Sequence, residues 1–365
     1  MTTTKNNEHK KLNVPNLRFP EFEGEWTEHT LGDISEFSKE RLNSKELSCD
    51  NYVATENMLQ DYQGIVTASN IPSNTNVIKF SKGDVLLSNI RPYLKKVWYA
   101  DRDGGCSADV FVFKALAVCD TDFLHYIIAN DRFINFTMSG AKGVKMPRGD
   151  KEQMKTYKIG LPSKEEQRKI ANLLRLLDER IATQNKVINR LQSLIKGIAN
   201  KSFHVARETK PLLEFAPNIT SGNDKNGSGT IPLYGSTGII GMVKNASQKG
   251  NIVLVARVGT IGTVQFVNEP CGVSDNALII EAGDMTKYIY YFLKTYNFAR
   301  ITSGTTQPLI TASSLKKIAI PIFDIERSSN IVRCLSGLEK KLNIEKRYLL
   351  DMVMIKQYLL RQMFI

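Results

Sequence analysis

The sequence repeats one pattern of strands and turns, and such a repeat constrains the fold more than any other feature of the chain. The segment KGDVLLSNIRPYLKKV begins at Lys82, and KGNIVLVARVGTIGTV begins at Lys249, 167 positions later. Ser107 in GGCSADVFVFKA and Ser274 in PCGVSDNALIIEA are separated by the same interval. Because the interval holds over two apolar segments, we expect two equivalent domains in which each segment is a β-strand.

A polar loop follows in both copies. It runs from Ser139 to a strand that stops at Pro162, and from Ser303 to a strand that stops at Pro321. The apolar pattern after these prolines recurs at an interval of 161 rather than 167, so the second copy is six residues shorter. We expect the shortfall to lie between the repeated strands and this pattern, in the polar loop and its exit strand.

Each exit strand is followed by the spacing of a coiled coil, with core residues at alternating intervals of four and three. The expected core positions of the first segment are Ile170, Leu174, Leu177, Ile181, Gln184, Ile188 and Leu191. Those of the second segment are Ile331, Leu335, Leu338, Leu342, Glu345, Leu349 and Met352. Gln184 and Glu345 are polar interruptions at equivalent positions. We expect them to lie near each other and to fix the register of the helix pair.

The expected fold class is α+β, with two repeated mixed domains separated by two long helices that form an antiparallel coiled coil. DFLHYIIANDRFINF and MTKYIYYFLKTYNF are expected to be helical inside the domains. Because the termini of a domain usually lie close together, the second long helix should run back along the first. The expected boundaries are an N-terminal arm at 1–25, a first domain at 26–162, a first helix at 163–205, a second domain at 206–321 and a second helix at 322–365.

The composition favours a nucleic-acid partner. The formal net charge of +12 attracts polyanions, and nucleic acid is the most common large polyanion in a cell. The five cysteines are scattered and form no Cys-x-x-Cys pair, which favours a reduced, cytoplasmic protein without a zinc site. No stretch of about 18 apolar residues occurs, so we expect no membrane span.

Several enzyme signatures are absent from the sequence. It contains no Gly-Lys pair for a phosphate-binding loop, no Pro-Pro for an adenine methyltransferase motif and no Pro-Asp for a common nuclease motif. The four histidines are not spaced as metal ligands. We therefore assign no catalytic residue and no metal ligand to the chain.

The residues that could contact DNA lie in equivalent loops of the two copies. Arginine and lysine can donate to guanine or bind phosphate, and glutamine can pair with adenine. Any one of these residues could equally be a solvated loop residue, but together they favour DNA. The candidates are Arg91, Lys95, Lys96, Lys142, Lys145 and Arg148 in the first copy, and Arg257, Thr260, Thr305, Thr306 and Gln307 in the second.

With these segments placed, the chain resembles the specificity subunits of type I restriction-modification systems. The resemblance depends on the opening segment NVPNLRFPEFEGEWTEHTLGDI, on IGLPSKEEQRKIANLLRLLDERI and on the degenerate second copy IAIPIFDIERSSNIVRCLSGLEKKL. The second copy departs from the pattern where Ser328 stands in place of Gln167.

The resemblance implies a non-catalytic subunit whose two target-recognition domains each read one half of a bipartite double-stranded DNA sequence. It also implies that the helices set the gap between the halves and dock two methyltransferase subunits, which motor-nuclease restriction subunits join. S-adenosylmethionine, ATP and magnesium would belong to those partners. Two alternatives remain open: a coiled-coil scaffold that binds no DNA, and a recognition fragment of a fused restriction-methylation enzyme.

Overall fold

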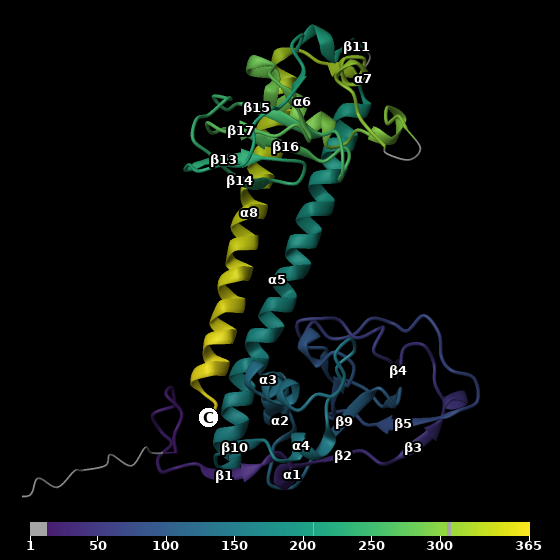
Figure 1. Ribbon diagram of the computed structural model, residues 1–365, viewed down its shortest axis with the longest axis vertical. Helices are drawn as coiled ribbons and strands as arrows, with labels where there is room; N and C mark the ends of the chain where they lie inside the picture. The colour runs from purple at the N-terminus through teal and green to yellow at the C-terminus, as the bar shows by residue number, and fades with distance from the viewer. Residues whose placement is uncertain (1–12, 207, 305–307) are drawn as a thin grey trace, which may run out of the picture. The chain divides into compact units, whose positions relative to one another are not determined.

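The computed structural model describes residues 13–206, 208–304 and 308–365. The chain forms two compact units, the first of residues 1–183 with 349–365, and the second of residues 184–348. Each unit therefore contains one mixed domain and part of each long helix (Figure 1). None of the described helices is long and apolar enough to cross a membrane.

The central sheet of the first unit has the strand order β2-β9-β6-β7 and is covered on both faces. One face packs against helices α2 and α3, and the other packs against a second sheet with the order β3-β5-β8-β4. All four residues of β6 are buried because the strand has no face toward water. The main elements are β2 (Ser35–Phe37), β6 (Val85–Ser88), β7 (Val97–Tyr99), β9 (Val110–Ala115), α2 (Thr121–Ile128) and α3 (Asp131–Ser139).

Shorter elements complete the first mixed domain. An antiparallel pair of β1 and β10 joins its beginning to its end. The remaining elements are β1 (Thr27–Thr30), α1 (Leu31–Ile34), β3 (Arg41–Asn43), η1 (Ser44–Glu46), β4 (Tyr52–Val53), β5 (Asn76–Phe80), η2 (Pro92–Leu94), β8 (Gly104–Cys106), α4 (Lys151–Lys155) and β10 (Lys158–Leu161), where η marks a 3-10 helix.

The second unit repeats this arrangement. Its central sheet has the order β12-β18-β15-β16 and packs on α6, while a three-stranded sheet β14-β13-β17 covers the other face. The strands are β11 (Glu208–Pro211), β12 (Thr220–Ser221), β13 (Ile231–Tyr234), β14 (Ile239–Val243), β15 (Ile252–Ala256), β16 (Val264–Val267), β17 (Gly272–Val273), β18 (Ala277–Ile280) and β19 (Ala319–Ile322). The helices are η3 (Leu212–Glu214), η4 (Gly283–Met285), α6 (Thr286–Leu293), η5 (Phe298–Arg300) and α7 (Ala312–Lys316).

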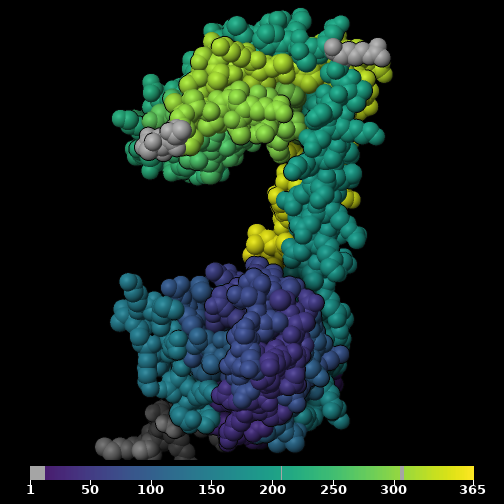
Figure 2. All heavy atoms as spheres, turned by 90° about the vertical axis from the view of Figure 1, so that its right-hand side faces the viewer, coloured from purple at the N-terminus to yellow at the C-terminus, as the bar shows by residue number. Residues whose placement is uncertain are grey.

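Two long helices, α5 (Lys164–His204) and α8 (Ile325–Gln362), pass through both units. Their N-termini are capped at equivalent positions, because Ser163 Oγ accepts from Glu166 N at 3.3 Å and Asp324 Oδ1 accepts from Arg327 N at 2.7 Å. The start of α5 packs with the end of α8 in the first unit, and the end of α5 packs with the start of α8 in the second. The predicted antiparallel pair is therefore confirmed. Figure 2 shows one side of α5, in teal, uncovered at the surface of the second unit.

The predicted core positions of the helix pair are all at least half-buried. Ile170 and Leu174 also pack into the core of the first mixed domain, and Leu335 packs into that of the second. The buried positions are Ile170, Leu174, Gln184, Ile188, Leu335, Leu342 and Met352. The half-buried positions are Leu177, Ile181, Leu191, Ile331, Leu338, Glu345 and Leu349.

The two polar core residues are in contact, as the heptad pattern predicts. Gln184 Nε2 donates to Glu345 Oε2 at 2.6 Å and to the Glu345 carbonyl oxygen at 3.2 Å. Gln184 is 6% exposed, so its amide depends on this partner rather than on water.

Replacing Gln184 by leucine is expected to destabilise the protein by about 1–3 kcal/mol, because Glu345 would lose its donor in a half-buried place. The double change Gln184→Leu with Glu345→Leu should recover most of this loss, since it removes both polar groups. Chemical denaturation of the three proteins measures both effects. If the Gln184→Leu protein were as stable as the parent protein, the pair would not contribute to stability as expected.

The strand register shows one error in the alignment of the repeat. Val85 pairs with Phe113 and Val253 pairs with Ile280, so β6 and β15 correspond at an interval of 168. The extra residue of the second copy is at Asn251, which has a left-handed backbone with φ of 54° between the Gly250 turn and the strand. The sequence interval of 167 is therefore wrong by one residue within this strand.

The six-residue shortfall was also predicted in the wrong place. Asn130 caps α3 and Asn297 caps η5, still 167 positions apart, but α3 has nine residues and η5 has three. After these helices, Lys142 forms an isolated β-bridge with Arg148, and Ser303 forms one with Leu309. The second bridge follows the first at an interval of 161. The polar loops therefore have equal lengths, and the second copy is shorter because a full helix is replaced by a single turn.

Candidate nucleic-acid interface

Three loops of the first unit meet at the end of β6. Asn89 N donates to the Asp109 carbonyl oxygen at 2.8 Å, which joins the end of β6 to the turn before β9. Arg91 N donates to the Pro147 carbonyl oxygen at 2.8 Å, which joins the same segment to the hairpin 142–148. Reciprocal bonds between Lys142 and Arg148, both at 2.9 Å, close that hairpin. The backbone thus supports one continuous rim of loops.

Four of the predicted cations lie on this rim. Arg91 and Lys145 are exposed and form no ion pair with the described residues. Arg148 Nη2 lies 3.2 Å from Asp109 Oδ1, and Lys142 Nζ lies 2.6 Å from Asp150 Oδ2. The Asp150 carboxylate accepts a hydrogen bond from Lys142 and raises the pKa of that ammonium group. Lys142 therefore carries positive charge at neutral pH.

Lys95 and Lys96 have partners inside the domain instead. Lys95 Nζ lies 2.9 Å from Asp131 Oδ1, and Lys96 Nζ donates to the Thr55 carbonyl oxygen at 2.6 Å. Both side chains are half-buried. Their ammonium groups hold the segment after β6 to α3 and to the loop at Thr55, so contact with a nucleic acid would first have to break these bonds.

The backbone on this segment is unusual. Arg91 and Lys95 flank η2 with φ of 52° and 53°, in the left-handed region that residues other than glycine rarely adopt. Such conformations occur where the surrounding structure fixes them, often at binding sites. They turn Arg91 toward solvent beside the hairpin.

The second unit builds the same arrangement with different side chains. Arg257 N donates to the Asn276 carbonyl oxygen at 3.0 Å, and Ile310 N donates to the Arg257 carbonyl oxygen at 3.1 Å. Ser303 and Leu309 close the hairpin with reciprocal bonds at 3.0 and 2.8 Å. Thr260 is exposed in the loop after β15. The predicted residues Thr305, Thr306 and Gln307 lie outside the described residues.

Arg257 corresponds to Asn89 rather than to Arg91. Asn89 and Arg257 each donate to the turn before the next core strand and each accept from the residue after the hairpin, Gly149 or Ile310. Arg91 and Arg257 are only 166 positions apart, so they occupy different places when β6 and β15 are aligned at 168. Arg257 is half-buried, and its Nε atom is buried without a hydrogen-bond partner among the described residues.

Sequence reasoning missed three residues of the rim. Asp109 orients Arg148, and its equivalent Asn276 follows the same serine turn, since Ser107 Oγ accepts from Asp109 N and Ser274 Oγ from Asn276 N. The repeated Ser-x-Asp and Ser-x-Asn sequences could have indicated this. Val144 and Met146 are exposed at the hairpin, where apolar side chains can contact thymine methyl groups. Nothing in the sequence distinguishes these two from core residues.

The specific motif at the start of α5 has a structural role. Gln167 Oε1 accepts from Asp120 N at 2.8 Å, and its Nε2 donates to the carbonyl oxygens of Val118 and Pro162. Glu166, which is 1% exposed, pairs with Arg18 through two contacts of 2.8 Å. The motif therefore fastens the arm and the domain to the helix. Among the described residues, no three His, Cys, Asp or Glu side chains gather as metal ligands.

The comparison with protein families gives two matches. A family model described as "Type I restriction modification DNA specificity domain" matches residues 23–193 and 208–351. Together these segments cover most of the chain, with one match over each mixed domain.

Two curated relatives are type I restriction enzyme specificity subunits. The EcoDI subunit of Escherichia coli is 28% identical over 129 residues, which cover 34% of this chain and 29% of that protein. The MjaVIII subunit of Methanocaldococcus jannaschii is 24% identical over 265 residues, which cover 58% of this chain and 62% of that protein. The matched part is less than two thirds of the length of each relative.

A solved structure extends the likeness over the whole chain. The type I restriction-modification system S subunit from M. genitalium matches with a TM-score of 0.69 at 19% sequence identity, covering 96% of this chain and 99% of that one. At this identity the likeness shows the fold, and it confirms the predicted α+β class with two repeated domains and long helices.

Proposed function

Because the chain belongs to the family of type I restriction-modification DNA specificity domains, we propose that it is the sequence-specificity subunit of such a system. Each mixed domain, here called a recognition domain, reads one half of a bipartite duplex. We keep the predicted domain boundaries of 26–162 and 206–321. The helices set the distance between the two halves and dock methyltransferase subunits, two for each specificity subunit.

One observation supports this proposal above the others. The rim of three loops is built twice, with equivalent backbone hydrogen bonds at the strand end, at the turn before the next core strand and across the hairpin, yet its side chains differ at equivalent places. Arg148 corresponds to Leu309, and Asp109 corresponds to Asn276. A constant backbone with variable side chains is what two readers of different base sequences require.

The rim residues divide into two groups. Arg91, Lys142, Lys145 and Arg148 are exposed and are the proposed DNA contacts of the first recognition domain, where Arg148 is the best placed for a base and the others for phosphates. Arg257 and Thr260 are the described candidates of the second. Lys95 and Lys96 are proposed to be structural because their ammonium groups have partners inside the domain.

The catalytic reactions are proposed to be carried out by the partner subunits. The methyltransferase subunits would bind S-adenosylmethionine, and the motor-nuclease subunits would bind ATP and magnesium, while this chain supplies no catalytic group. A cytoplasmic location is part of the proposal, supported by five free thiols at the five cysteine positions.

The test is a selection from random duplexes by the purified chain bound to its methyltransferase partner. We expect two short conserved blocks separated by a fixed gap of unselected bases. Affinity should fall steeply with salt, with a slope of about −0.9 for each phosphate neutralised. A scaffold would select no sequence, and a fused-enzyme fragment would select one block. Either outcome would overturn the proposal.

A further inference from the structure

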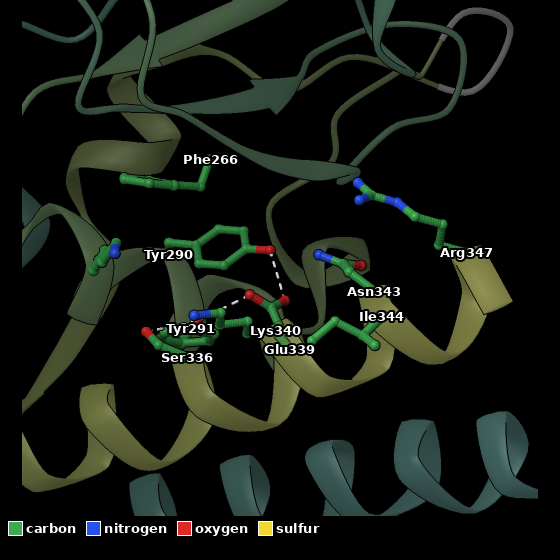
Figure 3. Close-up of a pocket in the computed structure, with 10 residues that line it drawn as sticks. Phe266, Tyr290, Tyr291, Ser336, Glu339, Lys340, Asn343, Ile344 and Arg347 are labelled. Atoms are coloured by element: carbon green, nitrogen blue, oxygen red, sulfur yellow. Dashed lines mark hydrogen bonds between the residues drawn. The ribbon is translucent and has the colours of Figure 1, made fainter.

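A pocket of about 450 Å³ lies in the second unit, where α6 and β16 face α8. Figure 3 shows Phe266 and Tyr290 on one side and residues of α8 on the other. Ile344 of α8 is 59% exposed at this place, and Phe266 is half-buried. The pocket therefore offers apolar surface that no described residue covers.

The one carboxylate among the described residues that line the pocket, Glu339, already has hydrogen-bond donors from the protein itself. Glu339 Oε1 accepts from Tyr290 Oη at 2.9 Å and from Lys294 Nζ at 2.8 Å, while Glu339 Oε2 accepts from Tyr291 Oη at 2.9 Å. These bonds fasten α6 to α8, and the dashed lines of Figure 3 mark those among the residues drawn. Glu339 is thus committed to groups of the protein itself.

The remaining charges of the pocket are positive. Lys287, Lys340 and Arg347 line it, all three are exposed, and none forms an ion pair with the described residues. Lys287 Nζ lies 5.3 Å from the centre of the Phe266 ring. Three cations thus surround an apolar floor, and they attract an anion that also has an apolar part.

At the equivalent place of the first copy, two of the three cations are replaced by carboxylates. The counterpart of Glu339 is Asp178, which accepts from Tyr126 Oη at 2.9 Å and lies 2.6 Å from Lys356 Nζ. Helices α2 and α6 correspond at an interval of 165, which aligns Tyr126 with Tyr291 and Asp122 with Lys287. Helices α5 and α8 correspond at an interval of 161, which aligns Asp178 with Glu339 and Glu179 with Lys340. The tyrosine-carboxylate contact is conserved between the copies, whereas acidic residues replace Lys287 and Lys340. Arg347 corresponds to Lys186, and Arg175, which pairs with Glu179, corresponds to Ser336.

We propose that the pocket of the second unit binds an acidic segment of a partner protein. Its carboxylates pair with Lys287, Lys340 and Arg347, and an apolar side chain of the same segment covers Phe266 and Ile344. Because Asp122 and Glu179 stand in place of two of these cations, the first copy lacks the charges that would hold such a segment, and each chain binds one. The two halves of this repeated protein are thereby distinguished by charge, independently of the DNA that they read.

A protein segment fits these features better than a nucleic-acid backbone. Phosphates would meet the cations, but the bases of a duplex are stacked inside it, so its charged backbone offers little apolar surface to cover Phe266 and Ile344. Acidic residues beside a leucine or phenylalanine satisfy both parts of the pocket.

The test measures binding of a short labelled peptide, in which glutamates flank a central leucine and phenylalanine, to the full chain by fluorescence anisotropy. Changing Lys287→Asp with Lys340→Glu installs the residue types of the first copy and should weaken binding about tenfold or more. Ile344→Ser should weaken it without a change of charge. Circular dichroism checks that both variants fold.

The matched control is Lys196→Glu with Lys201→Asp, which makes the same change of net charge at exposed positions of α5 in the same unit. We expect nearly unchanged peptide binding. Equal weakening in both double variants would show general attraction and overturn the proposal, as would absence of binding to the parent protein. Displacement of the peptide by a short DNA duplex, lost in the pocket variant, would identify a phosphate site instead and also overturn it.

Discussion

Replacing Phe364 by alanine is expected to destabilise the first unit by about 3–5 kcal/mol. Phe364 is 6% exposed, and its ring stacks on Phe123 of α2 with a centroid separation of 5.0 Å. Its carbonyl oxygen also accepts from Arg132 Nη1 at 2.9 Å, and Asn130 Nδ2 donates to the Leu360 carbonyl oxygen at 3.1 Å. The end of the chain is thus part of the core of a domain near its beginning.

Chemical denaturation gives the size of this loss, and hydrogen exchange shows where it occurs. Protection should fall first in β6, β9 and α2, while β15 and β18 of the second unit stay protected. Tyr358→Ala is the matched control, because Tyr358 lies on α8 shortly before Phe364, is 57% exposed, and its loss should cost little. Equal destabilisation by the two substitutions would contradict the assigned role of Phe364.

Replacing Arg148 by alanine is expected to relax base choice in the first half of the target by about 1–3 kcal/mol and to leave the second half unchanged. Arg148 is anchored by the closed hairpin and by Asp109, so its guanidinium is held in one place before DNA arrives. A group held in advance discriminates between bases at a smaller cost in conformational entropy.

The same selection from random duplexes measures this effect position by position. Lys95→Ala serves as the control, since the ammonium group that it removes is paired with Asp131 and should change neither half of the selected sequence. A loss that spreads evenly over both halves would mean that Arg148 contributes general attraction to phosphates, and the assignment of a base contact would be wrong.

The large elements of this fold could be predicted because hydrophobic periodicity reflects burial directly. The heptad positions from Ile170 to Leu191 repeat a spacing that few other structures produce, and β6 and β15 are continuous apolar runs because both of their faces are covered. Because each of these patterns occurs in both copies, the order of domains and helices could be predicted from the sequence.

The details of the repeat could not be predicted because they depend on backbone conformation. The left-handed residue Asn251 adds one position without any change of hydrophobic pattern. The replacement of α3 by η5 is equally hidden, since both segments begin at an asparagine cap and both contain a buried phenylalanine, Phe133 or Phe298. Because neither difference alters the hydrophobic pattern, the predicted position of the six-residue shortfall, in the most polar segment, is wrong.

The loops of the candidate site could be predicted from the sequence, but the partners of their charged side chains could not. The loops were found because they follow repeated strands, yet the partners of the cations come from segments remote in sequence. Lys95 forms an ion pair with Asp131, and Lys96 donates a hydrogen bond to the Thr55 carbonyl oxygen. Nothing in the sequence near either lysine predicts its partner. Tertiary neighbours decide whether a lysine is paired inside the domain, so the sequence could not distinguish Lys95 and Lys96 from the exposed cations.

The two units differ in how much of the chain must be synthesised before each unit can fold completely. Residues 184–348 are continuous, so the second unit has all of its parts once they have left the ribosome. The first unit includes residues 349–365, and its core stays open at Ile170 and Leu174 until Met363 and Phe364 arrive. The domain translated first is therefore the last to be finished, and its apolar helix face stays unprotected throughout synthesis of the rest.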